Sequence, residues 1–188
     1  MNLQKFMGYI AQKNKPLEEI IEGWKVDPER KILYDSSGNV YEFHEITRRG
    51  DLAEIVMRGG NKGIILSGEP GIYHVKDILD GYYLLKKLGK GERLVSIDGR
   101  VRGRLYESFS SRKILDGKVY AVVRNRNDGS WRIVKIDKEG ETRSSVYEEI
   151  KQFEIKDAIV YAKVKDEGGW RIVKLNNCLL YTSPSPRD

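Results

Sequence analysis

The pentapeptide Trp-Arg-Ile-Val-Lys occurs twice in this chain, and that duplication constrains the fold more than any other feature. The copies begin at Trp131 and Trp170, 39 residues apart. A second match lies upstream, where Val119–Val122 corresponds to Val160–Lys163, and a two-residue difference in loop length reconciles the two spacings. A tandem repeat of this length predicts an array of similar units, because one small unit cannot bury its own apolar face without a neighbour.

Five segments share a weaker pattern, in which two mostly polar residues stand between two apolar residues. They are Leu17–Ile20, Phe43–Ile46, Val75–Ile78, Tyr106–Phe109 and Tyr147–Ile150. A run rich in Val, Ile, Tyr and Leu and then a glycine turn follow the later segments, which is typical of antiparallel strands. The apolar spacing within Ile78–Leu88 also suits a helix, but the repeat frame favours strands there. We predict units of strand, turn, strand, acidic corner, strand and turn.

The fold class is therefore predicted as mainly β, with tandem antiparallel repeats that form a partial β-propeller or an open β-solenoid-like array. We expect about four to five units within residues 16–177, the last one incomplete. At the N-terminus, Leu3, Phe6, Met7 and Ile10 lie at helical spacing, so a short amphipathic helix is predicted for residues 1–15.

The last eleven residues, Cys178–Asp188, differ abruptly in composition from the rest of the chain. They resemble a translated sequencing adapter at the end of a truncated metagenomic reading frame. Residues 178–188 are accordingly interpreted as a non-native or disordered tail, because Ser183, Pro184, Ser185 and Pro186 disfavour regular structure.

Composition excludes several classes of protein. No apolar run approaches the roughly 18–20 residues of a membrane-spanning helix, and no signal peptide is recognised, so a cytoplasmic location is expected. One cysteine among 188 residues excludes an internal disulfide framework and a cysteine zinc cluster. The net charge of +6 comes from 34 basic residues mixed with 28 acidic ones, which is usual for a solvated surface.

The stretch Gly129–Lys174 resembles the bacterial WG repeat. The shared features are a tryptophan strand, the Asp137–Gly140 turn, the Tyr147–Ile150 corner, Phe153, and a strand with Ala158 and Val164. Arg132 and Arg171 stand where that family has the glycine after tryptophan, and Leu17–Gly129 keeps only the turns and corners. The resemblance implies a β-propeller-like or solenoid-like array of sheets that is used for binding.

We predict that residues recurring in the units serve packing between units. These structural repeat positions are Trp131, Trp170, Tyr147, Ile150, Tyr120 and Tyr161. On this interpretation both tryptophans belong to the core rather than to a ligand site.

No catalytic constellation is found, so we predict that the chain is not an enzyme, with no catalytic residue, metal site or cofactor. The acidic corners resemble paired carboxylates, but adjacent residues on a strand point to opposite faces, so solvated turns are the better interpretation. His44 and His74 lack metal-ligand spacing. The glycine-rich stretches Gly59–Gly63 and Gly89–Arg93 do not fit a phosphate-binding loop.

Three functional hypotheses remain open. The first is a scaffold or recognition module that binds a protein, peptide or glycan partner. The alternative is a nucleic-acid or polyanion-binding module, and a further alternative is an accessory fragment of a larger enzyme. The candidate polyanion-binding residues are Arg100, Arg102, Arg104, Arg124 and Arg126. The first three alternate in sequence, so on a strand they share one face, and a row of guanidinium groups suits phosphates.

Overall fold

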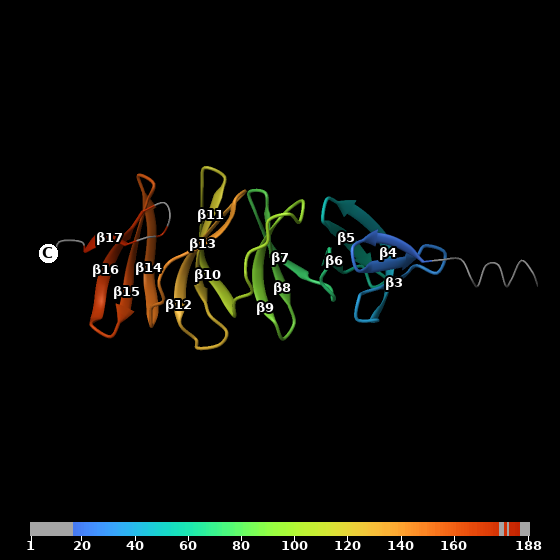
Figure 1. Ribbon diagram of the computed structural model, residues 1–188, viewed down its shortest axis with the longest axis horizontal. Coiled ribbons are helices and arrows are strands. Elements are labelled where there is room, and N and C mark those ends of the chain that lie inside the picture. The colour runs from blue at the N-terminus through green and yellow to red at the C-terminus, as the bar shows by residue number, and fades with distance from the viewer. Residues whose placement is uncertain (1–16, 177–178, 180, 185–188) are drawn as a thin grey trace, which may run out of the picture. The chain divides into compact units, whose positions relative to one another are not determined.

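The computed structural model describes residues 17–176, 179 and 181–184, and in that part of the chain the protein is built of antiparallel strands with no helix (Figure 1). The helix predicted for residues 1–15 lies outside the described residues. The chain divides into two compact units, Met1–Gly71 and Ile72–Asp188. The prediction of a mainly β, repeat-like architecture is confirmed at this level.

The first unit is one six-stranded sheet whose strands follow chain order. The strands are β1 (Glu18–Ile21), β2 (Trp24–Asp27), β3 (Ile32–Tyr34), β4 (Val40–Arg49), β5 (Leu52–Met57) and β6 (Lys62–Leu66). The long strand β4 pairs with β3 through its first half and with β5 through its second half. Trp24 is fully buried, and its indole Nε1 donates to the carbonyl oxygens of Leu66 (3.1 Å) and Glu69 (2.9 Å).

Asp35 organises the predicted turn between β3 and β4. Its buried carboxylate accepts hydrogen bonds from the backbone N–H groups of Ser37 (2.9 Å), Asn39 (2.9 Å) and Gly71 (3.0 Å). The Asn39 amide (2.8 Å) and the Tyr41 hydroxyl (3.1 Å) also donate to it. Burial alone would raise the pKa of Asp35, but hydrogen bonds from Asn39, Tyr41 and Ser37 outweigh burial, and the pKa lies below its usual 3.8.

Asp35 should therefore make the stability of the first unit depend on pH. Because the folded-state pKa is lowered, its stabilising contribution is complete above the unfolded-state pKa of about 3.9 and is lost as the pH falls through the folded-state value. We expect Asp35→Asn to cost about 1–3 kcal/mol at pH 7 and progressively less below pH 4. Urea unfolding of both proteins at pH 7, 5 and 3 measures this difference. A difference that stays constant with pH would contradict the assignment.

The second unit contains three sheets in chain order (Figure 1). The first has β7 (His74–Leu79), β8 (Tyr82–Lys87) and β9 (Gly91–Ser96). The second has β10 (Ser108–Leu115), β11 (Lys118–Arg124), β12 (Trp131–Asp137) and β13 (Gly140–Arg143). The third has β14 (Glu149–Lys156), β15 (Ile159–Asp166), β16 (Gly169–Leu175) and β17 (Tyr181–Pro184). The preference for strands over a helix within Ile78–Leu88 is confirmed.

The duplicated pentapeptide occupies equivalent places in two sheets. Arg132 of β12 pairs with Val123, and Arg171 of β16 pairs with Val164. On the outer side of β16, β17 pairs with it, so Tyr181–Pro184 of the predicted tail forms a strand. Pro184 is the last residue of that strand, a position where a proline removes little pairing.

At four of the predicted corners a strand shifts its register against its neighbour, in β4 within the six-stranded sheet and in the first strand of each later sheet. The shift follows Phe43 in β4, Val75 in β7, Phe109 in β10 and Ile150 in β14. Phe43 and Val75 open their four-residue motifs, whereas Phe109 and Ile150 close theirs, so the sequence alignment of the corners is wrong by three residues between the two pairs. A β-bulge bends its strand and increases the local twist, which explains why the corner recurs.

Successive sheets of the second unit are joined by backbone pairs at the corner tyrosines. Glu92 of β9 and Tyr106 exchange two N–H···O bonds of 2.8 Å. Trp131 of β12 and Tyr147 do the same, again at 2.8 Å. Tyr106 and Tyr147 are both buried, so they hold equivalent places between one sheet and the next.

Most of the structural repeat positions are buried or pack against the core, whereas Trp170 is exposed. Tyr120 and Tyr147 are buried, while Trp131 and Ile150 pack against the same core. Trp170 is 39% exposed, with the Lys151 and Lys163 ammonium groups 4.5 and 5.9 Å from its ring centroid. Trp131 pairs with Tyr147 at the start of the following sheet, whereas Trp170 is flanked by lysine side chains. Tyr161 is half-buried.

Candidate anion-binding site

The segment that carries Arg100, Arg102 and Arg104 is a loop between β9 and β10, so these arginines do not form the row that a strand would give them. Gly99 has a positive φ of 75°, and single backbone contacts replace a continuous ladder. Arg100 points to solvent beside Asp98 (3.8 Å), and the Arg102 Nε donates to the Gly99 carbonyl (2.8 Å). Alternation in sequence gives a shared face only on a regular strand, and glycine breaks this one.

Arg104 instead lines a pocket of about 380 Å³, here named the arginine pocket. Its lining residues come from the β9–β10 loop, the β11–β12 turn, β12 and β13. They are Arg104, Leu105, Tyr106, Asn125, Arg126, Asn127, Asp128, Arg132 and Arg143. Four guanidinium groups and one carboxylate give this lining a formal charge of +3.

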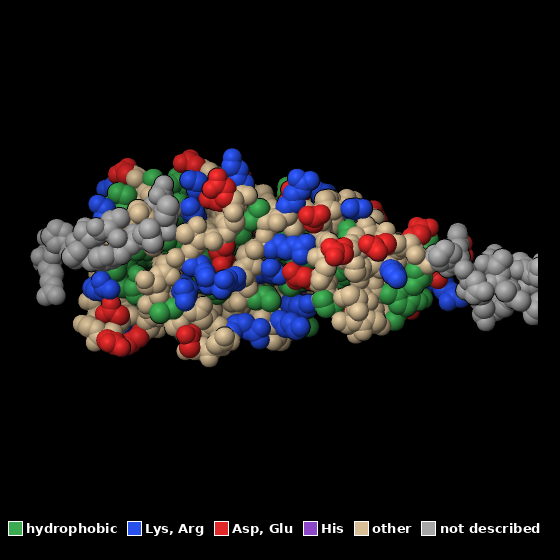
Figure 2. All heavy atoms as spheres, viewed as in Figure 1, with side chains coloured by type: hydrophobic (Ala, Val, Ile, Leu, Met, Phe, Trp, Pro, Cys, Tyr) green, Lys and Arg blue, Asp and Glu red, His purple; other side chains and the backbone are tan. Residues whose placement is uncertain are grey.

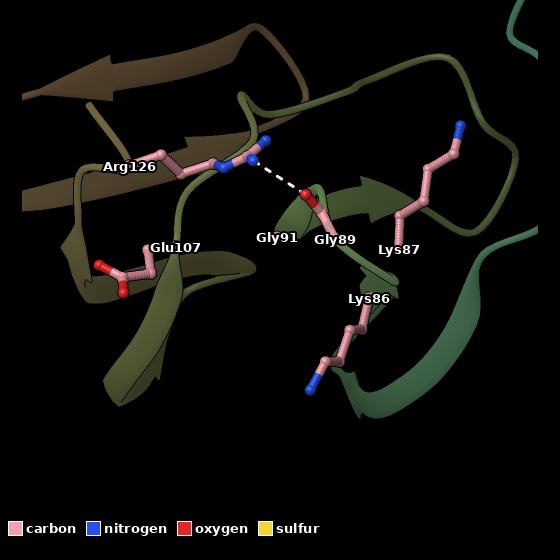
Figure 3. A pocket seen from close by; sticks show the side chains of 6 residues that line it. All are labelled: Lys86, Lys87, Gly89, Gly91, Glu107 and Arg126. Carbon is pink, nitrogen blue, oxygen red and sulfur yellow. Dashed lines mark hydrogen bonds between the residues drawn. The ribbon is translucent and has the colours of Figure 1, made fainter.

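A second pocket of about 360 Å³, here named the lysine pocket, shares Arg126 with the arginine pocket. Its lining residues are Lys86, Lys87, Gly89, Gly91, Glu107 and Arg126. Figure 3 shows Arg126 reaching to the Gly89 carbonyl oxygen, to which its Nη2 donates at 3.0 Å. Figure 2 shows Lys and Arg side chains gathered over this part of the second unit.

Arg132, which lines the arginine pocket, has an unsatisfied donor. Its Nη1 donates to the Ser144 carbonyl oxygen at 3.1 Å. Its Nε is buried and has no hydrogen-bond partner among the described residues. A buried N–H without an acceptor costs about 1–3 kcal/mol, so this guanidinium would gain by donating to an acceptor oxygen.

Glu141 fixes the loop that carries Arg104. Its Oε2 accepts from the Tyr106 hydroxyl at 2.9 Å, and its Oε1 accepts from the Arg104 backbone N–H at 3.2 Å. Burial, and then the nearby Glu141 carboxylate, raise the pKa of Tyr106 far above its usual 10, so the phenol stays neutral and donates at every physiological pH. The loop is therefore held in place before any ligand binds.

Within the described residues, the arginines of the arginine pocket have no ion-pair partner at short range, and Asp128 and the adjacent Glu141 offset only part of their charge. In the described part of the chain, none of Arg104, Arg126, Arg132 and Arg143 forms an ion pair within 4.0 Å. Hydrogen bonds from the Ser130 hydroxyl and backbone N–H, with a smaller contribution from Arg132, lower the pKa of Asp128. Asp128 is consequently ionised at neutral pH and is the one acidic residue of the lining.

Of the five arginines proposed from sequence, the structure brings only Arg104 and Arg126 into this pocket. Arg124 lies 3.3 Å from Glu107 and turns toward Trp131, with its guanidinium carbon 5.9 Å from the ring centroid. Arg132 and Arg143 were missed. For Arg132 a signal existed, since it replaces the glycine that follows tryptophan in the WG repeat; for Arg143 the sequence offers none.

The other candidate groups of the sequence lie outside this site. The corner acids Glu107 and Glu148 are exposed and pair with Arg124 and with Lys165 (3.4 Å). The imidazole of His44 is exposed and contacts the Arg58 carbonyl oxygen (3.1 Å). Within the described ranges, no three His, Cys, Asp or Glu residues are placed to hold a metal ion, and no helix has the length and apolarity to cross a membrane.

The chain was compared with family models, curated proteins and solved structures. No family model matches it, and no curated protein matches it either. Among solved structures, the crystal structure of the computationally designed Ika8 protein aligns with a TM-score of 0.36 and 11% identity. That alignment covers 82% of this chain, which spans 57% of the designed protein's length.

Proposed function

We propose that this chain is a non-enzymatic β-repeat module, an open array of WG-like units, that binds an acidic protein, peptide or glycan partner. The observation that carries the proposal is the pair of adjacent basic pockets that share Arg126. Together their linings hold six basic side chains and two acidic ones. Guanidinium groups are weakly hydrated and present a rigid fork of donors, so such a surface is suited to carboxylates, sulfates and phosphates.

The alternative, binding of nucleic acid, is supported by the same charge but by no stacking surface. Single-stranded nucleic acids are usually held by exposed aromatic rings in addition to a basic groove. Tyr106 is the only aromatic residue in the two linings, and it is 3% exposed. We therefore favour a partner that is recognised through acidic side chains.

We expect the chain to bind a fluorescein-labelled oligoglutamate peptide with an affinity that falls as salt is raised, because the attraction is screened. Replacing Arg126 by Ala should weaken this binding about 5- to 10-fold, since Arg126 faces both pockets. Fluorescence anisotropy at low and physiological salt measures the effect.

Arg100→Ala is the matched control. It removes the same charge from an exposed side chain outside both linings. Equal losses for Arg100→Ala and Arg126→Ala would mean that net charge, rather than the pockets, drives binding. Turnover of a substrate by the purified chain would contradict the non-enzymatic part of the proposal.

A further inference from the structure

We propose that the arginine pocket is a phosphate site, and that it receives a phosphorylated side chain of a peptide partner. This inference rests on the proposed function and names the chemistry of its strongest subsite. The observation that separates this pocket from the rest of the basic surface is the convergence of Arg104, Arg126, Arg132 and Arg143 on one concavity.

The donor set fits a dianion with three free oxygens. A phosphomonoester carries a charge of about −1.5 to −2 at neutral pH and three strong acceptor oxygens. The arginine pocket offers a formal charge of +3 and four guanidinium forks. Arg132 uses Nη1 on Ser144 and keeps its buried Nε unpartnered among the described residues. Arginine forks make paired contacts with phosphate oxygens, so the convergence of four of them on one pocket suits a group with three free oxygens.

The pocket is better matched to a monoester than to its competitors. A carboxylate or a phosphodiester brings one negative charge, which leaves most of the +3 uncompensated. Attraction to the four arginines and repulsion from the ionised Asp128 both scale with the charge of the ligand, so a dianion gains about twice the net attraction of a monoanion. Because Glu141 holds the Arg104 backbone and the Tyr106 hydroxyl, the site needs little rearrangement to bind.

A peptide fits the surroundings of the pocket better than a nucleic acid does. The adjoining lysine pocket can take acidic residues that flank the phosphorylated one. Leu88, between two residues of that lining, is 76% exposed, and Leu105 lies half-buried in the arginine pocket. Apolar side chains beside a basic pocket suit a peptide, whereas the buried ring of Tyr106 offers no face to a base.

The experiment uses the full chain labelled with ¹⁵N and follows the arginine Nε–Hε signals. Phenyl phosphate, diethyl phosphate and benzoate are titrated separately. We expect phenyl phosphate to shift the Arg132 Nε signal and to bind about 10-fold more tightly than the other two. Arg132→Gln and Arg104→Ala should each weaken phenyl phosphate binding about 10-fold, and Arg100→Ala should leave it unchanged. Arg104 is exposed, so its variant tests the site even if Arg132→Gln disturbs the fold.

Asp128→Asn gives an independent test, because removing a negative charge from the lining should strengthen the binding of an anion. The amide keeps an oxygen for the Ser130 contacts of 2.7 and 2.9 Å but removes the repelling charge. We expect phenyl phosphate to bind about 3- to 10-fold more tightly to this variant. Unchanged or weaker binding would place the ligand outside the arginine pocket and overturn the inference.

Further arms identify the source of the phosphate. A degenerate phosphoserine peptide library should bind more tightly than the matched glutamate library, than inorganic phosphate and than an oligothymidylate. Inorganic phosphate as tight as the peptides would overturn the peptide assignment, and a tighter oligothymidylate would assign the site to nucleic acid. If oligoglutamate binding depends on Arg126 but phenyl phosphate binds no more tightly than diethyl phosphate and benzoate, this inference is contradicted and the proposed function stands. If neither the Arg126-dependent oligoglutamate binding nor the phosphate preference is observed, the proposed function is contradicted as well.

Discussion

Replacing Gly91 by Ala is expected to destabilise the second unit by about 4 kcal/mol or more. Gly91 opens β9 with a φ of 103°, a conformation that residues with a Cβ avoid. A Cβ built there overlaps the carbonyl oxygen of Tyr106 and lies 3.0 Å from its carbonyl carbon. Both obstacles are backbone atoms, which cannot rotate away.

The clash falls on the joint between two sheets. Next to Gly91, Glu92 and Tyr106 exchange their two backbone hydrogen bonds, and the Glu92 side chain accepts from the Phe109 N–H at 3.1 Å and from Lys76 at 2.7 Å. Moving Tyr106 to make room therefore breaks several buried bonds, each worth about 1 kcal/mol or more. The substitution should also remove anion binding, because Tyr106 and Gly91 line the two pockets.

Urea unfolding and hydrogen exchange of the Glu92 and Tyr106 amides measure this effect. Gly81→Ala is the matched control, since Gly81 has a φ of 86° in a turn of the same sheet and nothing within 4 Å of its Cβ position. The control should cost only the about 1–2 kcal/mol of a left-handed backbone. If the two variants lose the same free energy of unfolding, the backbone at the joint between the two sheets can move away from the added methyl group at little cost.

The sequence predicts the strands better than it predicts their joints. The duplicated pentapeptide and its upstream match mark β11, β12, β15 and β16 because alternating apolar residues and glycine turns are local signals. The sequence aligns Tyr106 with Phe43, whereas the bulges align Phe109 with Phe43, three residues later. Both Tyr106 and Phe109 are apolar, so only the pairing of β10 with β11 shows where the bulge lies. A bulge is a property of two strands, so one strand's sequence specifies it poorly.

The arginine pocket could not be predicted from the sequence, because it also depends on how separate segments of the chain come together. Arg104 and Arg143 are 39 positions apart, and they meet because one sheet packs on the next. Arg100 and Arg102 looked equivalent to Arg104, yet each is held by its own loop, near Asp98 and at the Gly99 carbonyl. Charge spacing in a sequence predicts a shared surface only where the backbone is regular.

The second large effect is expected in the first unit, where Trp24→Ala should cost about 3–5 kcal/mol. Trp24 is 0% exposed, and its ring lies 5.8 Å from that of Tyr41. Truncation leaves a large cavity and removes the indole donor from the Leu66 and Glu69 carbonyl oxygens. Hydrogen exchange should rise across β2 and β6, and Trp24→Phe should recover the packing but not the two hydrogen bonds.

Trp170→Ala is the contrasting change, and we expect it to cost less than about 1 kcal/mol. The two lysines near this exposed ring contribute cation–π contacts of about 0.5–1 kcal/mol in solvent. Trp131 and Trp170 have the same register, so equal sequence alone would assign both to packing. What differs is the neighbour, because Trp131 is paired with Tyr147 of the next sheet. A large cost at Trp170 would show that a further surface covers it in solution, and would restore the packing role that its sequence predicts.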